Sequence, residues 1–410
     1  MNYVCLSPLL PGLAATLLLL ILGGCQISEE HGYRLHQLES PAAPGSGQSN
    51  LAAKSSGEVY LSWIEPGLEH EHALKHAVLE PGAIKWGKAV TFVEGDNWFV
   101  NWADFPSLLP LKNNLLAVHW LEQVPGEWYA YHVSIAFKNV QPDSTLSEAI
   151  RPHFDDSPTE HGFVSMVPLQ DDRILAVWLD GRNMTGAHES GEMTLRSAEV
   201  STSGKILNSR VIDGRVCECC QTSAAQIGAS TIIAYRDRSD GEIRDISLSR
   251  YYNGQWSEPQ VAHEDNWHFM GCPVNGPVLT SSGDHGGLAW YTGSGEEAVA
   301  NYVHLNESLD DISNPIRIDD GNPLGRVDAV MQQDGTAWVS WVEKTEDGAE
   351  NRLRRIDKDG STGESITLHP LSPERQSGFP RMAISDDRII ITWIETGEED
   401  LVKTGFVELY

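Results

Sequence analysis

Seven short apolar segments along the chain share one ending. Each finishes on an aromatic residue, one further residue and, in six of the seven, an acid, as in Trp178-Leu179-Asp180. The segments span residues 59–65, 115–122, 174–180, 231–237, 287–292, 336–343 and 389–395. Their aromatic residues recur at intervals of 51 to 58 residues. Short apolar runs bounded by turn residues are typical of buried β-strands, so the pattern predicts a repeated β-unit.

Each repeat has room for four short strands, which is the blade of a β-propeller. Turn-forming pairs such as Asp334-Gly335 precede most of the repeated strands. After the last inner strand, near Pro380, only three strands remain before the end of the sequence. A strand at 33–38 is expected to supply the fourth. The sequence therefore predicts an all-β, seven-bladed β-propeller closed by an N-terminal strand, with six blades as the alternative.

The N-terminal residues follow a different pattern. Residues 9–22 are almost wholly apolar, a run that is short for a membrane span and suits a signal peptide. The run ends in Leu22-Gly23-Gly24-Cys25, which resembles the bacterial lipobox and implies lipidation of Cys25. We expect a signal peptide over 1–24, a lipid-anchored tether with the closing strand over 25–44, and the propeller over 45–410. An ordinary signal peptide is the alternative.

The charge balance limits the partners of the chain. Its 29 basic and 58 acidic residues give a net charge of −29. Nucleic acids and anionic lipid headgroups would repel such a surface. We therefore expect no nucleic-acid partner, and membrane contact only through the lipid anchor. The expected location is the bacterial cell envelope, with the propeller facing the periplasm or the outer surface.

Reactive side chains are concentrated in the loops that meet at one mouth of the propeller, which predicts a functional face there. Five arginines have planar donor groups that suit a carboxylate, sulfate or phosphate, and two tryptophans suit stacking on sugar rings. These candidate substrate-binding residues are Arg182, Arg215, Arg236, Arg326, Arg381, Trp102 and Trp267. The alternative is that the arginines pair with neighbouring acids (Asp180, Asp237, Asp328) and tie blades together.

The same loops carry candidates for acid–base chemistry. Most glycosidases use two carboxylates, and sialidases replace the nucleophile with a tyrosine. Carboxylates that could form the pair include Asp104, Glu160 and Asp237, and either Tyr235 or His161 could act as nucleophile or base. The alternative for each residue is a structural ion pair or a turn cap.

Four cysteines remain after the leader and Cys25 are set aside: Cys217, Cys219, Cys220 and Cys272. An even number in an oxidising compartment favours two disulfides, and Cys272 could join adjacent blades. The alternative is a copper(I) or zinc site, because thiolates at this spacing with Met270, His268 or His161 nearby suit soft metals. With disulfides favoured, the sequence assigns neither a metal nor a cofactor.

The most specific loop motif of the chain is Arg215-Val-Cys-Glu-Cys-Cys-Gln-Thr222. This motif and several others resemble those of the bacterial sialidase-like (BNR-repeat) β-propeller proteins. Others lie at 101–107, 160–165, 177–182, 235–239, 242–245, 271–277 and 377–382. The resemblance spans roughly residues 45 to 405. It implies a propeller and a glycoside hydrolase activity of the exo-α-sialidase type.

Two functions are therefore expected. The first is a cell-envelope lipoprotein with a sialidase-like propeller that binds an acidic glycan or another anionic small molecule in an arginine-rich central pocket, with hydrolysis left open. The second is a non-catalytic scaffold or metal-binding propeller organised around Cys217, Cys219, Cys220 and Cys272.

Overall fold

The computed structural model describes residues 33–69, 71–141, 144–184, 191–295 and 297–409. The predicted signal peptide, the lipidation at Cys25 and the first part of the tether lie outside these residues. Within them, the helical elements are two short 3-10 turns, η1 (Lys112–Asn114) and η2 (Arg375–Ser377). Neither is long or apolar enough to cross a membrane.

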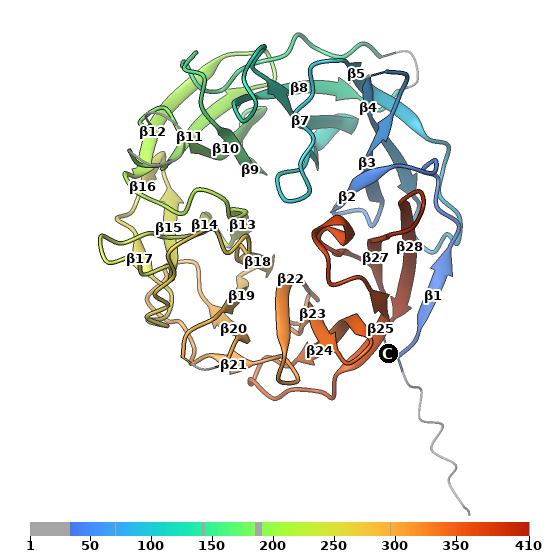
Figure 1. Ribbon diagram of the computed structural model, residues 1–410, viewed down its shortest axis with the longest axis vertical. Helices are drawn as coiled ribbons and strands as arrows, with labels where there is room; N and C mark the ends of the chain where they lie inside the picture. The colour runs from blue at the N-terminus through green and yellow to red at the C-terminus, as the bar shows by residue number, and fades with distance from the viewer. Residues whose placement is uncertain (1–32, 70, 142–143, 185–190, 296, 410) are drawn as a thin grey trace, which may run out of the picture. The chain divides into compact units, whose positions relative to one another are not determined.

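The described strands form seven antiparallel sheets that stand around a common axis (Figure 1). Blade 1 consists of β2 (Gly47–Ala53), β3 (Val59–Pro66), β4 (His72–Leu79) and β5 (Val90–Gly95). Blade 2 consists of β6 (Ser107–Pro110), β7 (Leu115–Gln123) and β8 (Tyr131–Asn139). Blade 3 consists of β9 (His161–Pro168), β10 (Arg173–Asp180), β11 (Thr194–Ser201) and β12 (Ile206–Asp213). Blade 4 consists of β13 (Ser223–Ile227), β14 (Ser230–Arg236), β15 (Ile246–Tyr252), β16 (Gln255–Trp256) and β17 (Gln260–Val261). Blade 5 consists of β18 (Val278–Ser282), β19 (His285–Thr292), β20 (Val299–Leu305) and β21 (Ile316–Arg317).

Blade 6 consists of β22 (Pro323–Met331), β23 (Ala337–Thr345), β24 (Gly348–Ile356) and β25 (Ile366–Leu371). Blade 7 takes β26 (Arg381–Ser385), β27 (Arg388–Glu395) and β28 (Leu401–Glu408) from the C-terminal part and β1 (Leu35–Leu38) from the N-terminal part. β1 pairs antiparallel with β28, with Leu35 opposite Val407 and Leu38 opposite Thr404. The seven-bladed prediction and the closing strand are confirmed, and the six-bladed alternative is wrong.

The repeated aromatic-x-acid ending has a structural role in the second strand of the blades. The aromatic side chains are buried, and a buried indole N–H needs an acceptor. In blades 1, 2, 3 and 6 the acid two residues later supplies it: Trp120 donates to Glu122 at 3.0 Å, and Trp178 donates to Asp180 at 2.8 Å. In blade 5, where Thr292 replaces the acid, the indole of Trp290 donates to Asp265 of the preceding loop at 2.7 Å.

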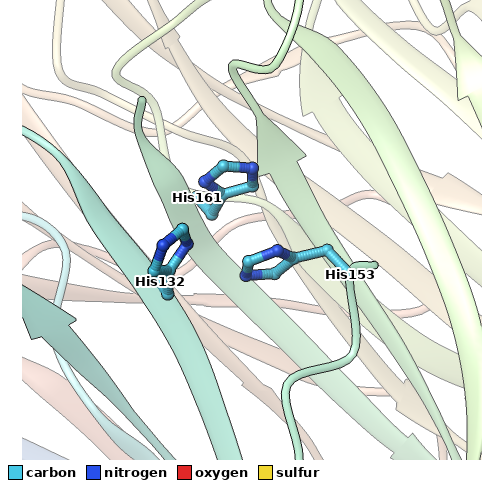
Figure 2. Close-up of side chains that lie close together, drawn as sticks. All are labelled: His132, His153 and His161. Atoms are coloured by element: carbon cyan, nitrogen blue, oxygen red, sulfur yellow. The ribbon is translucent and has the colours of Figure 1, made fainter. Parts of the chain in front are cut away.

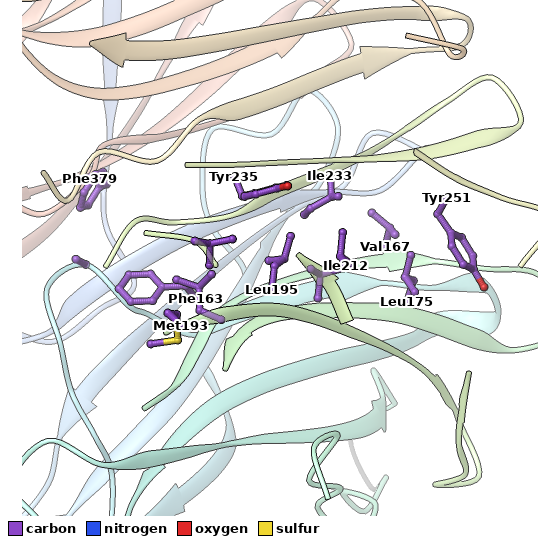
Figure 3. Close-up of a cluster of buried hydrophobic side chains, with 14 residues drawn as sticks. Phe163, Val167, Leu175, Met193, Leu195, Ile212, Ile233, Tyr235, Tyr251 and Phe379 are labelled. Carbon is purple, nitrogen blue, oxygen red and sulfur yellow. The ribbon is translucent and has the colours of Figure 1, made fainter. Parts of the chain in front are cut away.

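The hydrophobic core lies between neighbouring blades. Figure 3 shows the interface of blades 3 and 4, where Val167, Leu175 and Leu195 pack with Ile233 and Tyr251 in one buried cluster. Burying such a side chain contributes about 1.5–3 kcal/mol relative to its exposure to water. Contact of blade against blade therefore stabilises the ring and fixes the loops at its mouths.

Candidate functional sites

The inner strands surround a pocket of about 290 Å³. Every blade contributes lining residues, among them Asn50, Ser107, Ser165, Ser223, Val278, Asp328 and Arg381. Asp104, Asp328 and Arg381 are its charged lining residues among the described part of the chain. The centre of the ring is therefore a small pocket with two carboxyl groups and one guanidinium group.

Asp104 is buried where the loop before blade 2 meets blade 3. Its Oδ1 accepts the N–H of Phe163 at 2.9 Å, whereas its Oδ2 is buried without a hydrogen-bond partner among the described residues. Burial raises the pKa of Asp104 to about 7, and the Phe163 N–H and the nearby Tyr131 side chain offset only part of that rise. A Cβ at Gly162 would lie 1.9 Å from Oδ2 of Asp104, so the glycine leaves room for the carboxyl group.

Asp328 and Arg381 connect blades 6 and 7 at the pocket. Oδ1 of Asp328 lies 3.5 Å from Nη1 of Arg381, and Oδ2 accepts the N–H of Met382 at 2.6 Å. Burial raises the pKa of Asp328, while the Arg381 guanidinium opposes that rise. The pocket thus holds one ion pair and, at Asp104, one carboxyl group that keeps its proton near neutral pH.

The Asp104→Asn variant is expected to change how stability depends on pH. Because the pKa of Asp104 is about 7 in the folded protein and the ordinary pKa of an aspartate is 3.8, unfolding releases a proton between these pH values. The wild-type free energy of unfolding should therefore fall as pH rises from 5 to 8, by about 2–3 kcal/mol from this group. The amide oxygen of Asn can still accept the Phe163 N–H, so the variant should lack that fall.

Urea unfolding at both pH values measures this difference. Asp96→Asn, at an exposed loop position, is the matched control and should follow the wild type. Parallel pH profiles for Asp104→Asn and the wild type would contradict the raised pKa.

The predicted arginines do not converge on the central pocket. Arg182 makes a two-point ion pair with Asp180, with both N–O distances 2.7 Å. Arg215 pairs with Asp240 and lies 3.7 Å from Glu242. Of the five predicted arginines, Arg381 lines the pocket, so the expectation of an arginine-rich central pocket is not met.

Two of the five arginines, Arg236 and Arg326, are buried. They donate hydrogen bonds to main-chain carbonyl oxygens and to one hydroxyl group, which lie in the next blade or in the loop that leads to it. Arg236 of blade 4 donates to the carbonyl oxygens of Asn275 at 2.7 Å and Tyr291 at 2.7 Å. Arg326 of blade 6 donates to Ser377 Oγ at 2.6 Å and to the carbonyl oxygen of Glu374 at 3.0 Å. These two arginines therefore connect neighbouring blades, as the alternative interpretation expected. Their acceptors are carbonyl and hydroxyl oxygens, which the sequence does not identify as partners, and not the carboxylates that it suggested.

The predicted catalytic residues are also distributed over several environments. Asp104 lines the central pocket, whereas Glu160, His161, Tyr235 and Asp237 are not among its lining residues. Tyr235 lies in the core between blades 3 and 4, and burial raises its pKa well above the usual range. Burial is also the main cause that raises the pKa of Glu160 to about 8 and that of Asp237 to about 6.

The two predicted stacking residues differ in exposure. Trp267 is buried, and the guanidinium group of Arg236 lies 4.8 Å from its ring. Trp102 is half-buried and stacks on Phe379 at 5.4 Å, with the guanidinium group of Arg326 5.7 Å from its ring. Trp267 is thus part of the interior, and Trp102 remains the better placed for a ligand.

The loop between blades 3 and 4 brings three cysteines together. The sulfur of Cys217 lies 3.3 Å from that of Cys220 and 3.9 Å from that of Cys219, and all three sulfurs lie within 4.8 Å of one another. Cys217 and Cys220 are buried, and Cys219 also contacts Cys272 from the next loop. All four are free thiols, so the two disulfides favoured by the sequence are not formed. The closest sulfurs are well beyond the S–S bond length of about 2.05 Å.

The thiols of this cluster differ in pKa. Although burial raises the pKa of Cys220, hydrogen bonds from Cys217 and Cys219 and the nearby Arg236 guanidinium hold it well below its usual range. Burial raises the pKa of Cys217 to about 12. Cys220 is therefore the first thiolate of the cluster.

Charged residues fix the cysteine loop from outside. Glu218 pairs with Arg238 and, at 3.0 Å, with Arg244. Both arginines also pair with Glu242 at 2.8 Å. This network holds the segment between Cys217 and Cys219 in one position.

A histidine cluster between blades 2 and 3 escaped prediction. His161 lies beside His132 and His153 rather than beside the cysteines, and ligand nitrogens of the three lie within 4.8 Å of one another. Burial lowers the pKa of His132 to about 4 and that of His153 to about 2. The three residues are on β8, on an irregular segment and on β9, so no spacing rule joins them.

No protein-family model and no curated protein matches this chain. Among solved structures, it is similar to a Dyadobacter fermentans protein of unknown function (TM-score 0.53, 11% identity, 93% of this chain and 100% of that one). It is also similar to the phage phi92 endosialidase (TM-score 0.51, 8% identity, 92% of this chain and 69% of that one). At such low identities the likeness concerns the fold alone, which is a β-propeller with an endosialidase among its structural neighbours.

Proposed function

We propose that this protein binds copper(I) through the sulfur atoms of Cys217, Cys219 and Cys220, with Cys272 at the edge of the site. The observation that carries the proposal is the grouping of three free thiols within 4.8 Å of one another. Thiolates select soft metals such as copper(I). In this proposal the propeller is a metal-binding protein and not a hydrolase.

The surroundings of the cysteines support a thiolate site. The Arg236 and Arg244 guanidinium groups lie close enough to affect Cys220 and Cys217, and positive charge favours thiolates. Next to the cluster, a pocket of about 580 Å³ is lined by Met184, Met270 and Cys272. Thioethers are further soft ligands, and they would receive the ion at the surface before the buried thiolates bind it.

Competition of the reduced full chain against a coloured copper(I) chelator tests the proposal. We expect one copper(I) per chain, and a loss of affinity above about 100-fold in Cys217→Ser and Cys220→Ser, more than the 10–100-fold typical of an outer-shell partner. His268→Ala is the control, because His268 is exposed and is not part of the ligand group. Isolation of the native chain with two disulfides and no metal-binding capacity would reject the proposal.

We propose further that lipid on Cys25 holds the propeller in the bacterial cell envelope. The Leu22-Gly23-Gly24-Cys25 sequence supports this location. The mass of the mature N-terminus would reveal the acyl chains, and an unmodified N-terminus downstream of Cys25 would exclude them.

Binding of an acidic glycan in the central pocket is a second candidate function. Arg381 lines this pocket and provides the positive group, and the proton held by Asp104 near neutral pH is what a general acid needs. A panel of acidic glycans and a fluorogenic sialoside test the candidate. Binding that is lost in Arg381→Met would support it, and neither binding nor turnover by the wild type would rule it out.

A further inference from the structure

Three buried imidazoles meet at the seam between blades 2 and 3. His132 is on β8, His161 begins β9, and His153 is on the irregular segment that connects the two blades. The ring centroids of His153 and His161 are 4.0 Å apart, and that of His132 is 5.1 and 5.2 Å from them (Figure 2). Their exposed fractions are 7%, 2% and 0% for His132, His153 and His161.

One ring nitrogen of His161 faces two carboxyl groups. Nδ1 faces the carbonyl oxygens of Thr159 at 3.2 Å and Tyr131 at 3.3 Å, so it carries the proton and donates there. Nε2 lies 3.0 Å from Oδ2 of Asp155 and 3.7 Å from Oδ1 of Asp180. In a neutral ring this nitrogen would present a lone pair to a carboxylate. A cation shared by Nε2 and Asp155 removes the repulsion.

The other two rings repeat parts of this arrangement. Nδ1 of His153 faces the carbonyl oxygen of Asp155 at 3.2 Å. A ligating histidine usually donates its second N–H to a carbonyl or carboxylate in this way. Nε2 of His153 accepts a long, 3.3 Å hydrogen bond from Val133, which a metal bond would replace. Nδ1 of His132 is buried and has no hydrogen-bond partner among the described residues.

We propose that His132, His153 and His161 hold a structural zinc ion, and that Asp155, whose Oδ2 lies 3.0 Å from Nε2 of His161, moves onto the ion as the fourth ligand. Three imidazoles and one carboxylate are ligands that Zn²⁺ accepts in a closed, four-coordinate site. Asp180 is not counted as a ligand, because both its oxygens already accept bonds from Arg182.

The position of the site indicates what zinc would do for the fold. Blade 2 has three regular strands, and after β8 its chain is held by isolated bridges such as Ile135–Ile150 and Tyr131–Glu160. His153 and Asp155 lie on this irregular segment. Zinc would fasten the segment to β8 and β9, at the outer side of a blade that lacks the fourth strand of the others.

Zinc titration of the metal-free full chain tests this proposal separately from the cysteine site. The background variant carries Cys217→Ser, Cys219→Ser, Cys220→Ser and Cys272→Ser, so that any zinc bound is not held by thiolates of the cysteine site. In this background we expect one zinc per chain and a rise of the unfolding temperature on zinc addition. Cobalt(II) at the site should show no thiolate charge-transfer absorption.

Two variants in the same background remove the ligands at different cost to folding. His153→Ala deletes a buried ring, and Asp155→Asn keeps the size of a partly exposed side chain. Both are expected to lose at least about tenfold in zinc affinity and the zinc-dependent stabilisation. His119→Asn, at another buried histidine of blade 2, should retain both. Failure of the background variant to bind zinc, or unchanged affinity in Asp155→Asn, would leave His161 and Asp155 as a plain ion pair and overturn the proposal.

Discussion

The Arg236→Ala variant is expected to lose on the order of 5 kcal/mol of unfolding free energy. Its guanidinium group is buried and donates to the carbonyl oxygens of Arg244, Asn275 and Tyr291 at 2.6–2.7 Å. Removing it leaves three buried acceptors without a donor, at about 1–3 kcal/mol each, and removes the contact with Trp267. Urea unfolding followed by tryptophan fluorescence measures the loss.

Two further variants distinguish the contribution of these hydrogen bonds from that of the positive charge and from the effect of truncating any arginine. Arg236→Lys keeps the charge but lacks the planar group that reaches three oxygens, so it should recover only part of the stability. Arg210→Ala removes an exposed arginine and should change stability by less than about 0.5 kcal/mol. Equal stability of Arg236→Ala and Arg210→Ala would show that blades 4 and 5 do not depend on this residue.

The Leu38→Asp variant is expected to open the ring. Leu38 is the buried residue of β1, and it packs with Val59, Leu79 and Ile390 where blade 7 meets blade 1. The substitution removes about 1.5–3 kcal/mol of apolar burial and places a carboxylate in an apolar contact, so the total cost should exceed about 4 kcal/mol. Thermal unfolding and size-exclusion chromatography measure the loss and the association of exposed β28 edges.

The neighbouring residue provides the control for ring closure. Gln37→Asp introduces the same side chain one position earlier, on the exposed side of β1. Its effect should stay below about 1 kcal/mol, because the acid points to solvent. Similar losses in both variants would mean that strand propensity, and not the buried contact of Leu38, controls the closure.

The blade architecture was predictable because it repeats. Trp120, Trp178 and Trp341 each need a core and an acceptor two residues later, so the same local requirement leaves the same trace in the sequence. The closing strand was predictable because blade 7 has only three strands in the C-terminal part of the sequence and needs a fourth from elsewhere. Blades 4 and 5 depart from the pattern, since Tyr235 donates to Asp213 and Trp290 donates to Asp265, both in other segments.

The candidate sites were less predictable because they depend on side-chain direction. Loops at one mouth of the ring can be grouped from topology, but the sequence does not reveal that Arg236 and Arg326 turn inward to main-chain oxygens. Spacing did show that Cys217, Cys219 and Cys220 are close, although it could not show whether they are bonded. His132 and His153 meet only because an irregular segment folds back beside β8.

The pairing of β1 with β28 sets an order of events when the chain is made. Blades 1 to 6 consist of strands that follow one another in sequence, so each can assemble soon after its own residues emerge. Blade 7 joins residues 35–38 to residues 401–408. β1 therefore stays unpaired until residues 401–408 have also been synthesised, and a chain released before that point would carry two open sheet edges for proteases to find.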